Sequence, residues 1–346
     1  MARVLVLGGN GFYGRAVVDA LAQLDQVTVA TASRSTSPRV DLTDPSTFDA
    51  LDDADLVVNA SDAVGAPPDD AMRHVLGRGG RWLDLGADPQ AIERTLERLD
   101  GAMGAGTVAL GGGIFPGVST ALAAEAARRV GEVVTLELGV RISPFSGAGP
   151  ANVKLMTSSL DQPRVSWVGG LRRAGPPIEA GAPFPAPGGG EMRTLGLALG
   201  DAPLLHSIAP KASVSAGMAL KPDVMRHSFA ATGWLLRLLG PLRGLVLVPM
   251  GWQLGLMRGL LFRGVESAVD IAVVANRDRG NQVVLTAHAP QGRPAMGHGA
   301  AAFAEQLLGG GLPSGVVVGG AHVDVAQMVT TVHRRFGPGS LQVTGL

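Results

Sequence analysis

Apolar and polar positions change their spacing repeatedly along the first 130 residues. Short unbroken apolar runs, typical of buried strands, occupy residues 3–7, 27–32, 55–61, 81–85 and 107–110. Between these runs apolar residues recur three or four positions apart, as in amphipathic helices; the stretch that opens at Asp88-Pro89 carries Ile92 and Leu99 on one face. Strands and helices that alternate at this rhythm predict an α/β fold of the Rossmann type, with a doubly wound parallel sheet.

The pattern changes after about residue 131. We expect a strand over Val133–Ile142, with Glu137 and Arg141 on one face, and a hairpin made of residues 268–276 and 282–288. Further predicted segments are a helix over residues 151–160, strands and loops in the Pro- and Gly-rich residues 163–222, and a helix over Ala300–Leu308. This second part of the chain is therefore predicted to form a mixed α/β domain.

Residues 229–262 are strongly apolar. A membrane-spanning helix needs about 20 apolar residues in succession, but Arg237, Arg243 and Arg258 interrupt this run and two prolines divide it into short helices. Three interpretations stay open. The segment forms buried helices or a dimer interface, it is a lid over an apolar part of the substrate, or, less favoured, it makes peripheral contact with a membrane surface.

Composition narrows the class of protein. The chain has 346 residues, 46% of them hydrophobic, which is enough for two domains with real cores. Its 29 Lys and Arg balance its 29 Asp and Glu, so the charge gives no footprint for nucleic acid. The absence of cysteine excludes disulfides, thiolate nucleophiles and cysteine metal ligands. Since no signal-peptide pattern opens the chain either, we expect a cytoplasmic protein.

The turn after the first strand carries the clearest chemical signal. The apolar run ends in the pattern Gly-x-Gly-x-x-Gly, and a helical pattern follows at once. Such glycines allow a tight turn, close approach of the backbone to a pyrophosphate and close packing of helix on strand, while the helix N-terminus offers N–H groups to the phosphates. We expect this turn to bind a dinucleotide through Gly9, Asn10, Gly11, Phe12, Tyr13 and Gly14.

The end of the second strand indicates which dinucleotide binds. A site specific for NAD places Asp or Glu here to bind the ribose 2′-hydroxyl, whereas this chain has Ser33-Arg34. A carboxylate would repel a 2′-phosphate, while a serine hydroxyl and a planar guanidinium both bind one. The sequence therefore predicts NADP as the cofactor.

Other candidate cofactor contacts follow from position. Asp41 is placed to accept a hydrogen bond from the adenine amino group. Because ligands lie beyond the carboxyl ends of parallel strands, we expect further contacts after the later strands, from Asn59, Ala60, Ser61, Gly113 and Pro116. The glycine-rich residues 111–117 are predicted to wall the nicotinamide pocket, although a plain interdomain turn is the alternative.

Acid–base candidates are few. The only tyrosine is Tyr13, so no Tyr-x-x-x-Lys pair exists, and the seven histidines show no close metal-ligand spacing, so no metal site is expected. Asp84 follows a strand and is a candidate to face the nicotinamide, with helix capping as the alternative. His206 and Lys211 are weaker candidates in the second domain, and water or the substrate itself is a further source of the proton.

Several stretches together resemble one known family. They are residues 6–15, 32–34, 41–44, 54–60 and 82–86, the segment Gly113–Ser119 before an Ala-rich helix, and residues 297–308 with Pro313–Val316. This combination resembles the saccharopine dehydrogenase-like (saccharopine reductase) family over most of the first 130 and the last 60 or so residues. Between about residues 160 and 260 the resemblance is thin, and Pro150–Asn152 departs from the Gly-Thr segment expected there, which makes Asn152 a weak site candidate.

The resemblance implies a Rossmann domain over residues 1–131, a substrate and dimerisation domain over residues 132–300, and a C-terminal helix and tail, residues 301–346, that returns toward the first domain. It also implies NAD(P)-dependent chemistry, often at a carbon–nitrogen bond. The leading hypothesis is thus an NADP-dependent oxidoreductase that transfers hydride at the imine or amine of a small metabolite, as a homodimer.

Two alternatives stay open. One is an enoyl reductase that acts on a carbon–carbon double bond of a lipid or polyketide intermediate, which the apolar residues 229–262 favour. The other is a non-catalytic NADP-binding or redox-sensing protein, which the weak acid–base candidates favour.

Overall fold

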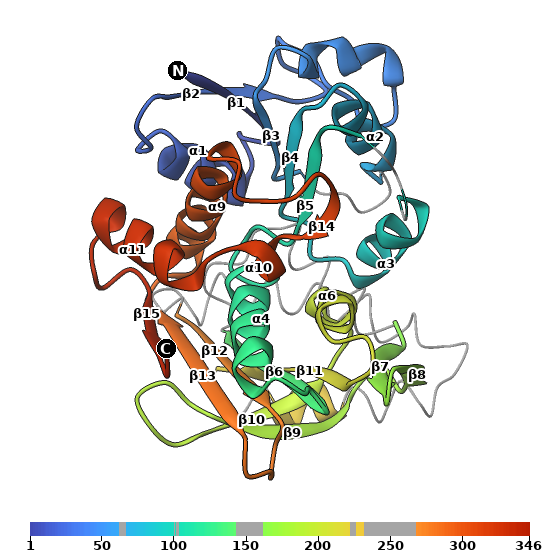
Figure 1. The fold of residues 1–346 in the computed structure, drawn as a ribbon, viewed down its shortest axis with the longest axis vertical. Coiled ribbons are helices and arrows are strands. Elements are labelled where there is room, and N and C mark those ends of the chain that lie inside the picture. Colours follow the sequence, from blue (N-terminus) through green and yellow to red (C-terminus); the bar gives the residue numbers. More distant parts are fainter. Residues whose placement is uncertain (62–66, 100, 102–103, 143–161, 222–225, 232–267) are drawn as a thin grey trace. The chain divides into compact units, whose positions relative to one another are not determined.

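The five short apolar runs near the N-terminus all form strands in the computed structural model (Figure 1). The strands are β1 (Ala2–Leu7), β2 (Val27–Ala32), β3 (Leu56–Asn59), β4 (Arg81–Asp84) and β5 (Thr107–Leu110). The helices that follow them are α1 (Phe12–Leu21), α2 (Asp69–Gly77), α3 (Pro89–Arg98) and α4 (Val118–Val130), with a short 3₁₀ helix at Pro45–Leu51. The structure describes all residues except 62–66, 100, 102–103, 143–161, 222–225 and 232–267.

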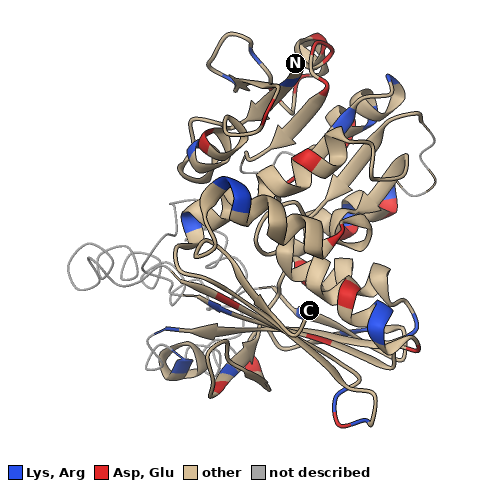
Figure 2. Cartoon of the chain, turned by 60° about the vertical axis from the view of Figure 1, so that its left-hand side comes forward, with Lys and Arg blue, Asp and Glu red and all other residues tan. Residues whose placement is uncertain are grey.

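The chain divides into two units, each of which takes residues from distant parts of the sequence. The first unit contains Met1–Glu125 and Arg293–Leu341, and the second contains Ala126–Gly292 and Gln342–Leu346. Lys and Arg are interspersed with Asp and Glu along the elements of each unit (Figure 2).

The sheet of the first unit has six parallel strands in the order β14-β5-β4-β3-β1-β2. α1 and α9 lie on one side of it and α2 and α3 on the other (Figure 1). Since both faces are covered, the strands read as continuous apolar runs rather than as an alternation, and all four residues of β3 are buried. The expected doubly wound parallel sheet is confirmed.

The C-terminal segment completes this unit in a way that the sequence pattern did not predict. A sixth strand, β14 (Gly315–Val318), pairs in parallel with β5, although no strand was expected at these residues. α9 (Gly292–Leu308) begins well before the expected start at Ala300. The chain then forms α10 (Gly319–His322) and α11 (Val325–Phe336). The glycines and proline in the first turns of α9 had hidden its helical spacing.

The second unit is built on a mixed sheet, as expected. Its strands run in the order β15-β13-β12-β6-β11-β10-β9, and a hairpin of β7 and β8 joins β11. Their bounds are β6 (Thr135–Ile142), β7 (Arg164–Val168), β8 (Leu171–Gly175), β9 (Glu179–Pro185), β10 (Glu191–Gly196), β11 (Ser213–Leu220), β12 (Val269–Ala275), β13 (Val283–Ala289) and β15 (Gln342–Thr344). β6 and β11 are parallel, whereas β12 pairs antiparallel with both β6 and β13. The helix α6 (Asp201–Ile208) precedes β11.

Some expectations lie outside the described residues. These are the helix over residues 151–160, the candidate Asn152, and residues 232–262 of the apolar segment. Within the described ranges, no helix has the length and apolar character needed to cross a membrane.

Candidate functional site

The glycine turn between β1 and α1 is tightly closed on itself. Gly8 has a φ of +73°, and its carbonyl accepts a hydrogen bond from the N–H of Gly11 at 2.8 Å. A Cβ on Gly14 would lie 2.0 Å from the same carbonyl oxygen, so the helix could not begin so close to the strand with any larger residue. The geometry therefore gives the third glycine of the pattern the packing role expected for it.

The N-terminus of α1 has no side-chain cap. Gly11 occupies the cap position in an extended conformation and offers no side-chain oxygen to the first turn. Around it, Arg15 donates from Nε to the carbonyl of Asn10 at 3.2 Å, and the rings of Phe12 and Tyr13 meet edge to face. A first turn left without a cap suits an anionic group, which the helix dipole also favours there.

This turn lies where the strand order of the sheet reverses. β1 pairs with β2 on one side and with β3 on the other, and a Cβ on Gly8 would lie 2.8 Å from Cα of Ser61, just after β3. Ligands of open α/β sheets bind at such a switch point, beyond the carboxyl ends of the strands. Gly9 through Gly14 and Asn59 through Ser61, which the sequence had singled out separately, thus come together.

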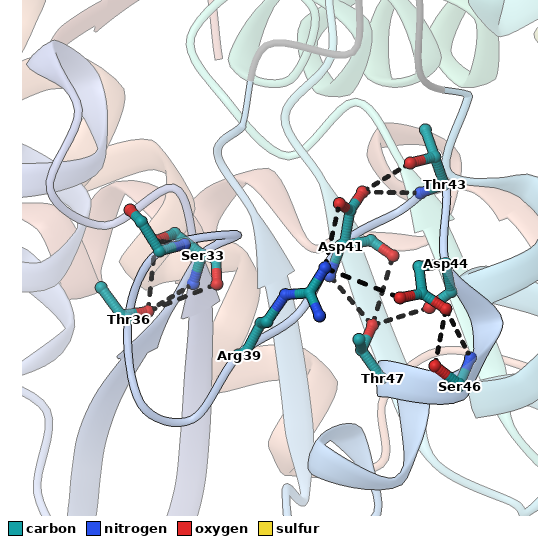
Figure 3. Close-up of polar contacts among 9 residues, drawn as sticks. Ser33, Thr36, Arg39, Asp41, Thr43, Asp44, Ser46 and Thr47 are labelled. Atoms are coloured by element: carbon teal, nitrogen blue, oxygen red, sulfur yellow. Dashed lines mark hydrogen bonds and ion pairs between the residues drawn. The ribbon is translucent and has the colours of Figure 1, made fainter.

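The loop after β2 presents several hydroxyl groups (Figure 3). Thr36 Oγ1 accepts hydrogen bonds from the Ser33 backbone N–H at 2.7 Å and from the Ser33 hydroxyl at 3.2 Å, and the Ser35 N–H donates to Ser33 Oγ. Ser33 was a candidate from the sequence, whereas Ser35 and Thr36 were not. The run of hydroxyl residues that begins at Ser33 was the available signal.

Arg34 is an exposed residue of this loop and makes no hydrogen bond or ion pair with the residues that the structure describes. Arg39, by contrast, lies 3.7 Å from Asp41 and 3.6 Å from Asp44 (Figure 3). Arg34 is thus the cation in this loop that is available to a ligand.

Asp41 is already engaged on both sides of its carboxylate. Thr43 donates to Oδ1 from its hydroxyl at 2.7 Å and from its backbone N–H at 3.0 Å, and these bonds, helped by the charges of Arg34 and Arg39, lower the pKa of Asp41. The carboxylate therefore stays ionised near neutral pH. The adenine contact expected for Asp41 remains a prediction.

A buried polar network joins the ends of β3 and β4. Asn59 donates to Asp84 Oδ2 at 2.8 Å, and its own Oδ1 accepts the Ser61 hydroxyl at 2.6 Å. Asp84 also accepts from the indole of Trp82 and the N–H of Gly86. Burial raises the pKa of Asp84 while these three donors oppose the rise. The contacts favour a positioning role for Asp84, which holds Asn59, and its expected role in catalysis stays a prediction.

The glycine-rich loop after β5 is folded tightly. Gly113 donates to the carbonyl of Pro116 and accepts from the N–H of Val118, each at 3.0 Å. A Cβ on Gly117, which has a φ of +150°, would lie 1.9 Å from the Gly113 carbonyl oxygen, and one on Gly113 would lie 2.5 Å from Sδ of Met296 in α9. Packing and backbone conformation therefore require a glycine at Gly117, while Gly113 faces the flexible end of Met296. The nicotinamide contact expected of Gly113 and Pro116 stays a prediction.

The two other acid–base candidates, His206 and Lys211, belong to the second unit, whereas Asp84 belongs to the first. His206 lies on α6 with its ring stacked on Trp167, 4.5 Å between centroids, and Lys211 is exposed between α6 and β11. Neither placement identifies a catalytic group. In the described part of the chain, no group of three His, Asp or Glu side chains could hold a metal ion.

Comparison with known proteins agrees with this geometry. A model of the NAD dependent epimerase/dehydratase family matches residues 4–75, which contain the glycine turn and the loop after β2. Apo saccharopine dehydrogenase (L-Glu forming) from Saccharomyces cerevisiae is similar in structure over 100% of both chains, with a TM-score of 0.59 at 14% sequence identity. This chain has the fold of saccharopine dehydrogenase. The resemblance noted in the sequence is confirmed at the level of the fold.

Two further solved structures are similar over most of their length. A mutant of meso-DAPDH with DAP from Clostridium tetani E88 covers 95% of this chain and 96% of its own, at 11% identity and a TM-score of 0.47. Amine dehydrogenase from Mycobacterium smegmatis covers 94% of this chain and 96% of its own, at 8% identity and a TM-score of 0.47. No curated protein matches the sequence.

Proposed function

We propose that this chain is an NADP-dependent oxidoreductase that transfers hydride at a carbon–nitrogen bond of a small metabolite. The observation that carries the proposal is the uncapped glycine turn at the switch point of the parallel sheet, next to the end of β2. The turn supplies N–H groups and close backbone approach for a pyrophosphate. The match over residues 4–75 to a family described as NAD dependent supports a nicotinamide dinucleotide of the NAD(P) class, without choosing between NAD and NADP.

The choice of NADP rests on the loop after β2. Arg34 makes no hydrogen bond or ion pair there with the described residues, and the hydroxyls of Ser33, Ser35 and Thr36 lie together. A 2′-phosphate would gain charge-assisted hydrogen bonds from such a loop. The carboxylate of Asp41 is held by Thr43 and lies 3.7 Å from Arg39, so the loop does not present it to the ribose as an NAD-specific acid.

The proposal of a carbon–nitrogen bond as the site of reaction comes from the saccharopine dehydrogenase whose fold is similar. Saccharopine dehydrogenase of S. cerevisiae is described as L-Glu forming, that is, as forming an amino acid. A homodimeric state and a cytoplasmic location belong to the same proposal.

Titration of NADPH and NADH tests the cofactor. We expect the wild-type protein to bind NADPH about ten- to a hundredfold more tightly, because a hydrogen bond to a charged group contributes about 1.5–3 kcal/mol. Arg34→Ala should remove most of this difference while NADH binding stays unchanged. Arg73→Ala is the matched control, since Arg73 is also an exposed arginine of the first unit and pairs with Asp70 on its own helix.

Two results would contradict the proposal. If NADH binds as tightly as NADPH, or if Arg34→Ala leaves the difference intact, the loop after β2 does not select NADP. If neither cofactor binds, the glycine turn serves packing alone and the proposed chemistry fails with it.

A further inference from the structure

Arg293 places a cation beside the glycine turn. It lies in the first turn of α9, within the same unit as the glycine turn, and its guanidinium carbon is 4.6 Å from the centre of the Phe12 ring. Phe12 is the first residue of α1 and directly follows Gly11, the second glycine of the pattern. The C-terminal part of the chain thus brings a positive charge to the turn that is expected to bind the dinucleotide.

The packing of α9 on α1 holds Arg293 at this place. A Cβ on Gly297 would lie 2.2 Å from the carbonyl oxygen of Ala16, so the two backbones are in contact there. Residues four apart lie on the same face of a helix. The contact between Arg293 and Phe12 lies one such step earlier on both helices. α1 and α9 therefore run in the same direction along this contact, and their first turns lie at the same end.

Positive charge gathers at this end of the two helices. Neither α1 nor α9 has an acidic residue in its first turn, and Arg293 makes no hydrogen bond or ion pair with the residues that the structure describes. Because the N-terminal ends of helices carry partial positive charge, a cation there is unfavourable and an anion is favourable. The arrangement therefore suits an anionic ligand that is bound by both helix ends and the guanidinium.

Contact with Phe12 leaves the hydrogen-bonding capacity of Arg293 unused. A guanidinium that lies over an aromatic ring is held at its face, while its N–H groups point outward in its plane. Phosphate oxygens accept such paired N–H groups in a bidentate manner. Arg277, which also lies over a ring, that of Phe184, has Glu137 as its ion-pair partner. The ring of Phe12 instead orients a guanidinium whose donors remain available beside the turn.

We propose that Arg293 binds the pyrophosphate of the dinucleotide at the glycine turn. This inference rests on the proposed function, in which the backbone N–H groups of that turn bind the same group. Arg34 and Arg293 then have different tasks. Arg34 binds the 2′-phosphate and so distinguishes the two cofactors, whereas Arg293 binds a group that NADP and NAD share. Because Arg293 comes from α9, the C-terminal segment contributes to cofactor affinity as well as to packing.

Titration of Arg293→Gln with both cofactors measures this role. Glutamine keeps an amide donor but has no charge. We expect the affinities for NADPH and NADH to fall by the same factor, about ten- to a hundredfold, because both cofactors carry the pyrophosphate. Arg293→Lys, which keeps the charge without the planar fork, should lose less. Arg73→Gln is the matched control, since Arg73 is an exposed arginine of the same unit that pairs with Asp70.

Two fragments of the cofactor separate Arg293 from Arg34. ADP-ribose carries the pyrophosphate without the nicotinamide or the 2′-phosphate, and adenosine 2′-monophosphate carries the 2′-phosphate without the pyrophosphate. We expect Arg293→Gln to weaken the binding of ADP-ribose about tenfold or more and to leave that of adenosine 2′-monophosphate unchanged. Arg34→Ala should have the opposite effect on the two fragments.

Two results overturn this role for Arg293 even where the cofactor binds. If Arg293→Gln keeps the wild-type affinity for ADP-ribose, the arginine only packs on Phe12. If the affinity for adenosine 2′-monophosphate and the Tm of the ligand-free protein fall together with the affinity for ADP-ribose, the residue is structural.

Failure of the proposed function gives a different pattern. If the wild-type protein binds neither cofactor nor ADP-ribose, the proposed function fails and the role of Arg293 falls with it. If NADH binds as tightly as NADPH while Arg293→Gln weakens both equally, the choice of NADP fails and the role of Arg293 is supported.

Discussion

His298 lies in α9 with its ring stacked on Phe336, 4.0 Å between centroids. Its Nδ1 is buried and has no hydrogen-bond partner among the residues described. Burial disfavours the charged form and lowers the pKa of His298 to about 4. The imidazole is therefore neutral in the folded protein at neutral pH and serves the packing of α9 against α11.

This residue predicts an acid-dependent loss of stability. The unfolded chain binds a proton at His298 near pH 6.5, whereas the folded chain does so only near pH 4, so the folded state loses stability as pH falls between these values. His298→Phe keeps the stacking and removes the titration. We expect the Tm of this variant relative to wild type to rise as pH is lowered from 7.5 to 4.5. A Tm difference that is independent of pH would show that His298 keeps its ordinary pKa in the fold.

The polar network of Asn59, Ser61 and Asp84 shows how far single site residues can be recognised from the sequence. Asn59, Ser61 and Asp84 were recognised as strand-end residues, because apolar runs end at them. Asn59 lies opposite Asp84 and donates to it because of the register between β3 and β4. No local sequence pattern encodes this register. The same holds for Arg141 of β6, Asp270 of β12 and His288 of β13, which are neighbours only once three strands are aligned.

At the scale of the elements, two glycines of α9 lie very close to the backbone of neighbouring segments. A Cβ on Gly297 would lie 2.2 Å from the carbonyl oxygen of Ala16 in α1, and one on Gly299 would lie 2.8 Å from that of Gly113. α9 therefore packs directly on α1 and on the loop after β5, both of which adjoin the proposed cofactor site. Small residues are what allow this approach.

Two glycine substitutions with opposite expected signs test this packing. Gly297→Ala should destabilise the protein by about 1–3 kcal/mol, because the added methyl group forces α9 away from α1. Gly77→Ala is the control: Gly77 is also helical, but a Cβ there meets nothing within 4 Å, so the change should stabilise by about 0.5–1 kcal/mol. Urea denaturation measures both. A neutral Gly297→Ala would mean that the two helices are not in the contact described.

Elements with strong local patterns were predictable from the sequence. β1 to β5, the hairpin of β12 and β13, and the helix capped by Asp88 all lie where apolar spacing and capping residues place them. β14 was missed, since a four-residue strand that begins at Gly315 resembles a turn and gains its hydrogen bonds only from β5, about two hundred positions earlier. Long-range pairing of this kind leaves little trace in a short segment.

At the scale of the whole molecule, residues 293–341 near the C-terminus complete the first unit. α9, β14 and α11 belong to the same unit as the glycine turn, although the second unit lies between them in sequence. The similar fold of saccharopine dehydrogenase extends over the complete chain rather than over the N-terminal sheet alone. The similarity in fold therefore concerns both units, and the proposed cofactor turn lies in the first.

The most direct test of this account follows the hydride itself. NADPH that carries deuterium at both positions of C4 of the nicotinamide would be mixed with the protein and either a carbonyl–amine pair or an enoyl thioester. The products would be analysed by mass spectrometry and NMR. The account predicts one deuterium per NADPH consumed, on the carbon that bears the new nitrogen. Deuterium on a former carbon–carbon double bond, or no transfer to any substrate despite tight NADPH binding, would contradict it.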